Sequence, residues 1–141
     1  MLAFDRFTES AQDAASRAFE ILQRYGHDQV DAEHLLLALL EQPEGVKPQV
    51  LDKISVDQKS IVKKRLDDVL GAKPKGAAIS GDGSGTVFIT ERLKSILDQA
   101  NEEAALLQDE RISTEHIFHA ILSERDTDVA RILAEAGLTG N

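Results

Sequence analysis

The stretch VDAEHLLLALL, from Val30 to Leu40, is nearly repeated by ISTEHIFHAIL, from Ile112 to Leu122. The two copies lie 82 residues apart, and the same offset continues without a gap on both sides of them. Between the pairs Asp5/Val87 and Gln58/Gly140 it gives nine identities, at positions 8, 9, 18, 20, 33, 34, 38, 40 and 51 of the first copy. The sequence therefore indicates an internal duplication.

The apolar pattern of the two copies supports this duplication more strongly than the number of identities. Apolar residues at positions 11, 15, 18, 22 and 25 correspond to apolar residues at 93, 97, 100, 104 and 107. Both sets have the spacing of one face of an α-helix. Because a period of this length is typical of stacked supersecondary units, we expect two copies of one helical bundle, with no strand in either.

Capping residues and glycines divide the first copy into four predicted helices. Thr8 and Gly26 bound a helix that ends at Tyr25, and Asp31 opens a short helix over 32–40, which must be buried because leucines occupy all its sides. A third helix ends near residue 54. A fourth, capped by Ser55 or Asp57, reaches Leu70 with an apolar edge made of Ile61, Val62, Leu66, Val69 and Leu70.

The stretch GAKPKGAAISGDGSG, residues 71–85, has no periodicity and predicts a glycine-rich linker. After it, Thr90 caps a helix over 91–107, and further helices follow at 114–123 and 128–136. The sequence stops at Asn141, where a fourth helix of the second copy would begin. We therefore expect repeat one over 4–70, a linker over 71–87 and repeat two over 88–141, with the last helix of the second repeat missing.

Composition limits the classes of function. The chain has 141 residues and no cysteine, which excludes disulfides, thiolate zinc sites and a cysteine nucleophile and suits the cytoplasm. No apolar run has the length of a membrane span, and the first residues are too polar for a signal peptide. Sixteen basic against 25 acidic residues give a net charge of −9, which disfavours nucleic acid as a partner.

The doubled pattern, with Thr-Glu at the start of the first helix and then YGHDQVDAEHLLLALL or LQDERISTEHIFHAIL, resembles the Clp amino-terminal domain of double-ring Clp AAA+ chaperones. The resemblance covers residues 4–138. The opening FDRFTESAQDAASRAFEIL is most similar to the ClpC type, whereas the linker and LQDERISTEHI are more similar to the ClpB type. The resemblance implies two tandem four-helix repeats related by a pseudo-twofold axis in one all-α domain.

Such a resemblance also implies a function. A domain of this family binds unfolded or aggregated proteins and ClpS-like adaptor proteins, and passes substrates to AAA+ rings in the same chain, in some parents together with a ClpP-type peptidase. The alternative is a stand-alone Clp-repeat protein that acts as a regulator or scaffold without an ATPase. The gene downstream of residue 141 separates the two, because a Walker motif there supports the first and a stop codon the second.

No catalytic motif or cofactor site is expected in this chain. Gly71 and Gly76 have the glycine spacing of a phosphate-binding loop, but Ala77 and Ala78 replace the lysine and hydroxyl residue that the loop requires. Glu115, His116 and His119 form the pattern EHxxH, which a small hydrolase or metal enzyme would use. Zinc needs further ligands in a tetrahedral set, so a packed or hydrogen-bonded histidine is the favoured interpretation.

Glu33 and Glu115 are the paired candidate site residues. Each lies in the first turn of its short helix, where the helix dipole stabilises a carboxylate, and this capping role alone could explain both. The family resemblance implies an alternative, in which these glutamates bind the guanidinium of phosphorylated arginine beside the first helix of the same repeat. The matching neighbours are Arg6, Thr8 and Glu9 in repeat one and Thr90, Glu91 and Arg92 in repeat two.

Apolar residues outside the helical stripe provide a second candidate surface. Phe19 and Ile21 lie off the stripe of the first helix, and Val87, Phe88 and Ile89 form an apolar run before Thr90. Such residues often only cover the rim of a core. If they instead line a groove between the repeats, that groove would accept extended segments of unfolded proteins.

Overall fold

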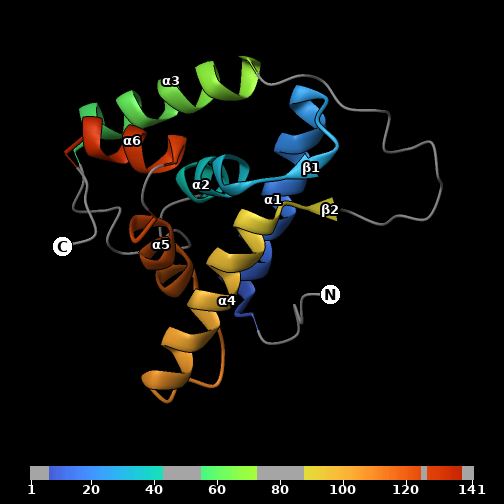
Figure 1. Ribbon diagram of the computed structural model, residues 1–141, viewed down its shortest axis with the longest axis vertical. Helices are drawn as coiled ribbons and strands as arrows, with labels where there is room; N and C mark the ends of the chain where they lie inside the picture. The colour runs from blue at the N-terminus through green and yellow to red at the C-terminus, as the bar shows by residue number, and fades with distance from the viewer. Residues whose placement is uncertain (1–6, 43–54, 73–87, 125–126, 138–141) are drawn as a thin grey trace.

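The computed structural model describes residues 7–42, 55–72, 88–124 and 127–137, and the chain is helical over most of these ranges. The helices are α1 (Glu9–Tyr25), α2 (Ala32–Glu41) and α3 (Val56–Ala72) in the first half, and α4 (Glu91–Leu106), α5 (Thr114–Leu122) and α6 (Asp128–Glu135) in the second (Figure 1). The predicted all-α class is confirmed. The helix expected to end near residue 54 and the linker residues 73–87 lie outside the described residues.

Hydroxyl side chains begin the helices at the predicted positions. Thr8 Oγ1 accepts a hydrogen bond from the Ala11 N–H at 3.2 Å, and Thr90 Oγ1 accepts one from the Leu93 N–H at 3.1 Å. Ser55, rather than Asp57, caps α3. Gly26 ends α1 with a φ of +73°, a left-handed conformation that glycine adopts without strain. The helix boundaries thus follow from local sequence, although α3 continues two residues beyond the predicted Leu70.

Short parallel pairings join the two halves, and the expectation of no strands was wrong in this detail. Strand β1 (Gln29–Val30) pairs with β2 (Phe88–Ile89), and Phe7 forms an isolated bridge with Ile112. The Thr90 N–H donates to the Val30 carbonyl at 3.1 Å, and the Thr8 N–H donates to the Ile112 carbonyl at 2.9 Å. These two bonds are equivalent under the offset of 82. In each half, the segment before the first helix pairs with the segment that precedes the second helix of the other half.

Helix α2 lies at the centre of the fold, as its apolar sequence requires. Every residue from Ala32 to Leu40 is buried, and α2 contacts α1, α3, α4 and α5. Helix α5 contacts α1, α2, α4 and α6. The second helices of the two halves therefore pack directly on each other along the seam (Figure 1).

The predicted apolar faces are correct in most positions and wrong in a few. In α1 the buried residues include Ala14 and Ile21, whereas Ala15 and Tyr25 are only half-buried. In α3 the predicted edge residue Ile61 is exposed. The largest departure is Leu107, which the stripe would bury but which is 67% exposed just beyond the end of α4.

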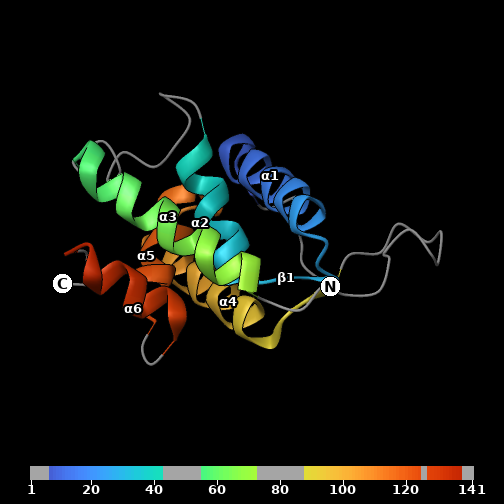
Figure 2. The same ribbon diagram turned by 90° about the horizontal axis from the view of Figure 1, so that it is seen from above.

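Helices α3 and α6 lie side by side across one end of the molecule (Figures 1 and 2). The C-terminal end of α4 projects from the opposite end (Figure 1). None of the helices in the described ranges combines the length and the apolar character needed to cross a lipid bilayer.

Candidate functional site

A histidine completes a capping box at the start of both short helices, which explains the repeated histidine. His34 Nδ1 accepts a hydrogen bond from the Asp31 N–H at 2.8 Å, and His116 Nδ1 accepts one from the Ser113 N–H at 2.9 Å. The Nε2 atom of each neutral ring therefore carries the proton. That atom lies 2.8 Å from His27 Nδ1 in the first half and 2.9 Å from Asp109 Oδ2 in the second.

An ion-pair cluster crosses the seam between the halves, and the sequence did not predict it. Arg92, near the start of α4, contacts both oxygens of Glu33 at 2.9 and 3.0 Å. The same guanidinium contacts both oxygens of Asp31 at 2.9 and 3.2 Å. Thr90 Oγ1 donates to Asp31 at 2.9 Å. Since Glu33 is fully buried, Arg92 neutralises a carboxylate that water does not reach.

The electrostatics of this cluster favour its charged form. Burial alone would raise the pKa of Asp31, but the Ala32 N–H, the charge of Arg92 and the Thr90 hydroxyl together lower it below its usual value. Burial likewise opposes the charged form of Arg92, but attraction to Glu33 and Asp31 raises its pKa. Asp31 and Arg92 are therefore both charged at neutral pH.

Glu124, at the end of α5, adds a further carboxylate next to this cluster. Burial raises the pKa of Glu124 above its usual value, the charge of Arg92 lowers it, and the charge of Asp31 raises it. The net shift is upward, because one arginine does not offset the desolvation of a carboxylate that faces another carboxylate.

The predicted grouping of the candidate glutamates within single repeats was wrong. Glu33 of the first half binds Arg92 of the second, because the seam places each first helix beside the second helix of the other half. The offset of 82 makes Ser10 the counterpart of Arg92 and Ser113 the counterpart of Asp31. Serine therefore stands at both positions that are equivalent to Arg92 and Asp31. Arg6 lies outside the described residues.

Glu115 lies on a depression between the C-terminal end of α4 and helix α5. The depression has a volume of about 670 Å³, and Glu115 is exposed on it. Its apolar lining includes Leu106 and Leu107, which are 82% and 67% exposed. The complete lining is Glu103, Leu106, Leu107, Asp109, Ser113, Glu115, His116, Phe118, His119 and Leu122.

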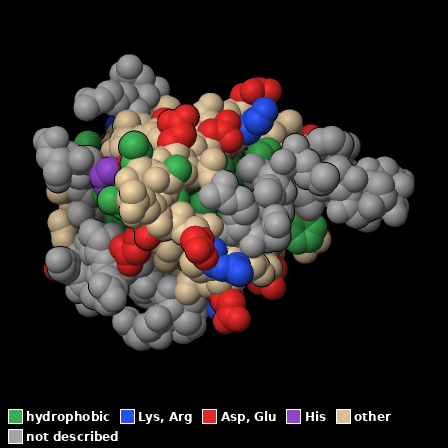
Figure 3. All heavy atoms as spheres, turned by 90° about the horizontal axis from the view of Figure 1, so that it is seen from below, with side chains coloured by type: hydrophobic (Ala, Val, Ile, Leu, Met, Phe, Trp, Pro, Cys, Tyr) green, Lys and Arg blue, Asp and Glu red, His purple; other side chains and the backbone are tan. Residues whose placement is uncertain are grey.

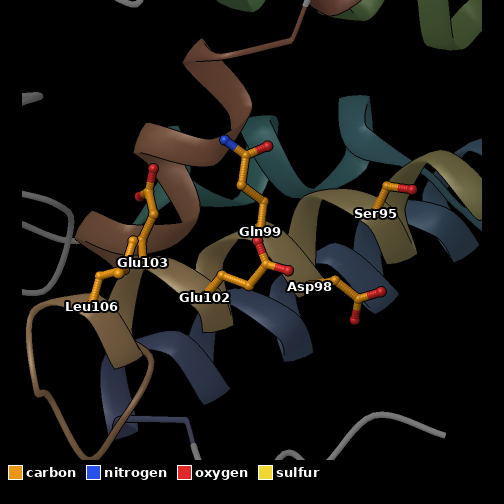
Figure 4. Close-up of a pocket in the computed structure, with 6 residues that line it drawn as sticks. All are labelled: Ser95, Asp98, Gln99, Glu102, Glu103 and Leu106. Atoms are coloured by element: carbon orange, nitrogen blue, oxygen red, sulfur yellow. The ribbon is translucent and has the colours of Figure 1, made fainter.

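A second, shallower depression of about 470 Å³ follows α4 itself, lined by Ser95, Asp98, Gln99, Glu102, Glu103 and Leu106. Gln99 and Glu103 point toward α5, whereas Asp98 points away from it (Figure 4). Both depressions share Glu103 and Leu106, so they form one continuous surface, which we call the α4/α5 surface. Seen from below, this end of the molecule shows a histidine and apolar side chains with acidic side chains beside them (Figure 3).

The groove predicted from Phe19, Ile21, Val87, Phe88 and Ile89 stays a prediction, although the placement of Ile21 does not fit it. Ile21 is fully buried in the core, and Phe19 and Ile89 are partly buried against it. Val87 and the side chain of Phe88 lie outside the described residues. Of the two exposed leucines near the C-terminal end of α4, Leu107 belongs to the stripe that sequence periodicity assigned to the core, whereas Leu106 lies outside that stripe.

The histidines of the EHxxH pattern contact different carboxylates. His116 binds Asp109, and His119 Nδ1 lies 2.7 Å from Glu103 Oε1. Within the described ranges, no group of three or more histidine or acidic side chains is placed to hold a metal ion. In this arrangement the two histidines fix the loop after α4 and the start of α5 rather than converge on one point.

Comparison with known proteins agrees with this architecture. A family model described as Clp repeat (R) N-terminal domain matches residues 6–136. The chaperone protein ClpB of Nitratidesulfovibrio vulgaris is 39% identical over 137 residues, which cover 95% of this chain and 15% of that protein. ClpC of Staphylococcus aureus, an ATP-binding subunit of an ATP-dependent Clp protease, is 29% identical over 97% of this chain and 16% of its own length.

A solved structure matches the fold as well. The N-terminal domain of ClpD from Arabidopsis thaliana superposes with a TM-score of 0.71 and 22% identity, over 99% of this chain and 92% of that one. The chain spans only 15–16% of the length of the ClpB and ClpC relatives, so the comparison concerns one domain of them. Because the family model covers nearly the whole chain, this chain belongs to the Clp repeat N-terminal domain family.

Proposed function

We propose that this chain is the substrate- and adaptor-binding domain of an ATP-dependent Clp chaperone, and that it delivers unfolded or marked proteins to AAA+ rings of the same polypeptide. The proposal includes repeats over 4–70 and 88–141 with a linker over 71–87. The observation that carries it is the α4/α5 surface, where two adjacent leucines are exposed beside a depression of about 670 Å³.

Exposed leucines of this kind favour a binding role over a purely structural one. Large apolar side chains that project together from a helix end gain free energy when a partner covers them, about 1.5–3 kcal/mol for each leucine that becomes fully buried. Unfolded proteins expose such side chains in many sequences. A shallow, open depression accepts apolar side chains from many different sequences.

The relatives indicate the setting in which this surface would act. One is called a chaperone and another the ATP-binding subunit of a Clp protease. Our proposal therefore gives the chain a binding role, and assigns ATP hydrolysis to rings elsewhere in the parent protein. ClpS-like adaptors, unfolded or aggregated substrates and, through the parent, a ClpP-type peptidase are the proposed partners.

Binding of an unfolded model protein and of a ClpS-type adaptor, measured by fluorescence anisotropy, tests the proposal. We expect the double variant Leu106→Ser, Leu107→Ser to bind the unfolded protein about tenfold more weakly, since it removes most of the exposed apolar area. The matched control is Ile61→Ser, because Ile61 is 44% exposed on α3, far from this surface (Figure 1). Absence of binding to both probes would count against a receptor role.

Glu115 supports a second candidate function, the recognition of phosphorylated arginine on marked substrates. The observation behind it is Arg92, whose guanidinium binds the equivalent carboxylate, Glu33, in the other half. Glu115, which is exposed, is the proposed guanidinium site, with Thr8 and Ser10 at the helix start that the bridge between Phe7 and Ile112 places beside α5. Titration with free phosphoarginine should show binding that Glu115→Ala abolishes with an unchanged melting temperature; equal binding by this variant would exclude the site.

A further inference from the structure

A buried pair of histidines lies between the end of α1 and the start of α2, and the proposed binding role does not use it. His27, just after α1, is 5% exposed, and His34, in the first turn of α2, is 1% exposed. His27 Nδ1 lies 2.8 Å from His34 Nε2, and the two rings meet edge to face with their centroids 5.0 Å apart. Two buried titratable rings in direct contact raise the question of where their protons are.

The hydrogen bonds fix the protonation state of both rings. His34 Nδ1 accepts from the Asp31 N–H at 2.8 Å, so the proton of this ring is on Nε2 and is donated to His27 Nδ1. The proton of His27 is then on its own Nε2, which is buried and has no hydrogen-bond partner in the part of the chain that the structure describes. Both rings are therefore neutral as long as these two bonds persist.

An additional proton would break one of these bonds. On His34 it would occupy Nδ1 and remove the acceptor of the Asp31 N–H, which opens the capping box of α2. On His27 it would occupy Nδ1 and face the His34 N–H across 2.8 Å. The second half differs, because Asp109, the counterpart of His27, is a carboxylate whose side chain is 49% exposed and which can offset a positive charge on His116.

The groups around the histidine pair keep their own charge states in mild acid. The charged and titratable groups that adjoin the pair or its direct neighbours are Tyr25 at the end of α1, Asp28 before β1, Asp31 and Glu33 at the start of α2, Asp67 of α3 and Arg92 of α4. Tyr25 stacks on His27 with centroids 5.8 Å apart, and burial followed by its hydrogen bond to Asp67 raises its pKa to about 12. The pKa of Asp31 is lowered and that of Arg92 is raised. A proton added between about pH 7 and pH 5 therefore goes to a histidine rather than to Tyr25, Asp31 or Arg92.

We propose that the His27–His34 pair is a pH-sensitive switch, which opens the start of α2 in mild acid. Opening releases Asp31 from the capping box, and the carboxylate of Asp31 is the group that also binds Thr90 and Arg92 across the seam. The open state leaves both rings free to bind protons, so below about pH 6.5 it binds more protons than the closed state and is favoured as the pH falls. This proposal concerns the stability of the domain and does not rest on its binding role.

Urea unfolding of the wild type and His27→Gln at pH 7 and pH 5 tests the proposal. Glutamine still accepts the His34 N–H but takes up no proton in this range. Each histidine that is neutral in the closed state and free in the unfolded state raises the unfolding equilibrium constant about 25-fold from pH 7 to pH 5. We expect this rise to be about 25-fold smaller in His27→Gln than in the wild type, and the comparison within each protein cancels any loss of stability at pH 7. The control His119→Gln removes an exposed histidine whose Nδ1 contacts Glu103, and it should not reduce the rise.

NMR spectra of the histidine ring nitrogens provide a second readout. At pH 7, both rings of the wild type should show a protonated Nε2 and a bare Nδ1. In mild acid, charged rings should appear together with changes in the amide signals of residues 31–34. An equal rise of the unfolding constant in the wild type and His27→Gln would overturn the proposal. So would a charged ring at position 27 or 34 while those amide signals stay unchanged, or a proton on His34 Nδ1 at pH 7.

Discussion

Replacing Arg92 by alanine tests the physical account of the seam between the halves. The substitution leaves Glu33, which is fully buried, and Asp31, whose side chain is 10% exposed, without their guanidinium. Removing one partner of a buried ion pair typically destabilises a protein by about 3–5 kcal/mol, because the remaining charge keeps its desolvation cost and loses the opposite charge that offset it. Arg92 itself is 28% exposed, so water reaches part of the cavity and the lower end of this range applies.

We therefore expect Arg92→Ala to lower the free energy of unfolding by about 3 kcal/mol at pH 7, which is roughly a 10 °C fall in Tm for a domain of this size. Urea unfolding followed by circular dichroism measures the change. The matched control is Arg131→Ala, since Arg131 is 70% exposed and pairs with Asp128 one turn away on α6. Such an exposed pair contributes less than about 0.5 kcal/mol.

The pH dependence gives an independent check. The pKa of Asp31 is lowered in the folded state, so its contribution to stability is complete above its usual value of 3.8 and is lost as pH falls through the lower folded value. The difference between wild type and Arg92→Ala should therefore shrink below about pH 4. A variant that loses no more stability than Arg131→Ala at pH 7 would refute this account of the seam.

Three further perturbations follow from single contacts. Tyr25 is the only tyrosine, and burial followed by its hydrogen bond to Asp67 raises its pKa to about 12, so the phenolate absorbance should titrate near that pH and shift downward in Asp67→Asn. Because the folded pKa exceeds the unfolded value of 10.0, this contact should stabilise the protein below pH 10 and lose its effect as pH rises toward 12. Gly26→Ala should cost about 1–2 kcal/mol in urea unfolding, since alanine is strained at a φ of +73°. Thr8→Ala should cost about 1 kcal/mol as a lost N-cap, and Thr90→Ala more, because Thr90 also donates a hydrogen bond across the seam; equal losses in thermal melts would contradict this.

Local sequence was sufficient to predict the helices. Threonine caps, the glycine after Tyr25 and the leucines of α2 each act within one or two turns, so the helix boundaries could be read without knowledge of the packing. The prediction that Leu107 is buried was wrong. The apolar stripe shows which face of a helix is apolar, but no local signal shows which neighbouring element covers that face. The exposed leucines are visible only once the arrangement of α4 and α5 is known.

Prediction of the ion-pair cluster requires knowledge of how the two halves face each other. The offset of 82 aligns each residue with its counterpart, but it does not say whether a helix start lies beside its own half or the other. One signal was nevertheless present in the sequence. Position 92 and position 31 carry an arginine and an aspartate, whereas their counterparts, positions 10 and 113, are both serine. Two positions that change together between the copies indicate a contact, and here that contact crosses the seam.

The duplication thus produces two seams with the same backbone pairing and different side chains. Around Glu33, the buried pair with Arg92 fixes the two halves against each other. Around Glu115, serines replace both charges, the glutamate is exposed, and the adjacent helix end carries two leucines that face solvent. A structural seam gains stability from a closed salt bridge, whereas a binding surface needs side chains that a partner can reach. With the function proposed above, divergence of the two copies gives Glu33 a stabilising role and Glu115 a proposed binding role. We therefore expect Glu33→Ala to change stability and Glu115→Ala to change affinity.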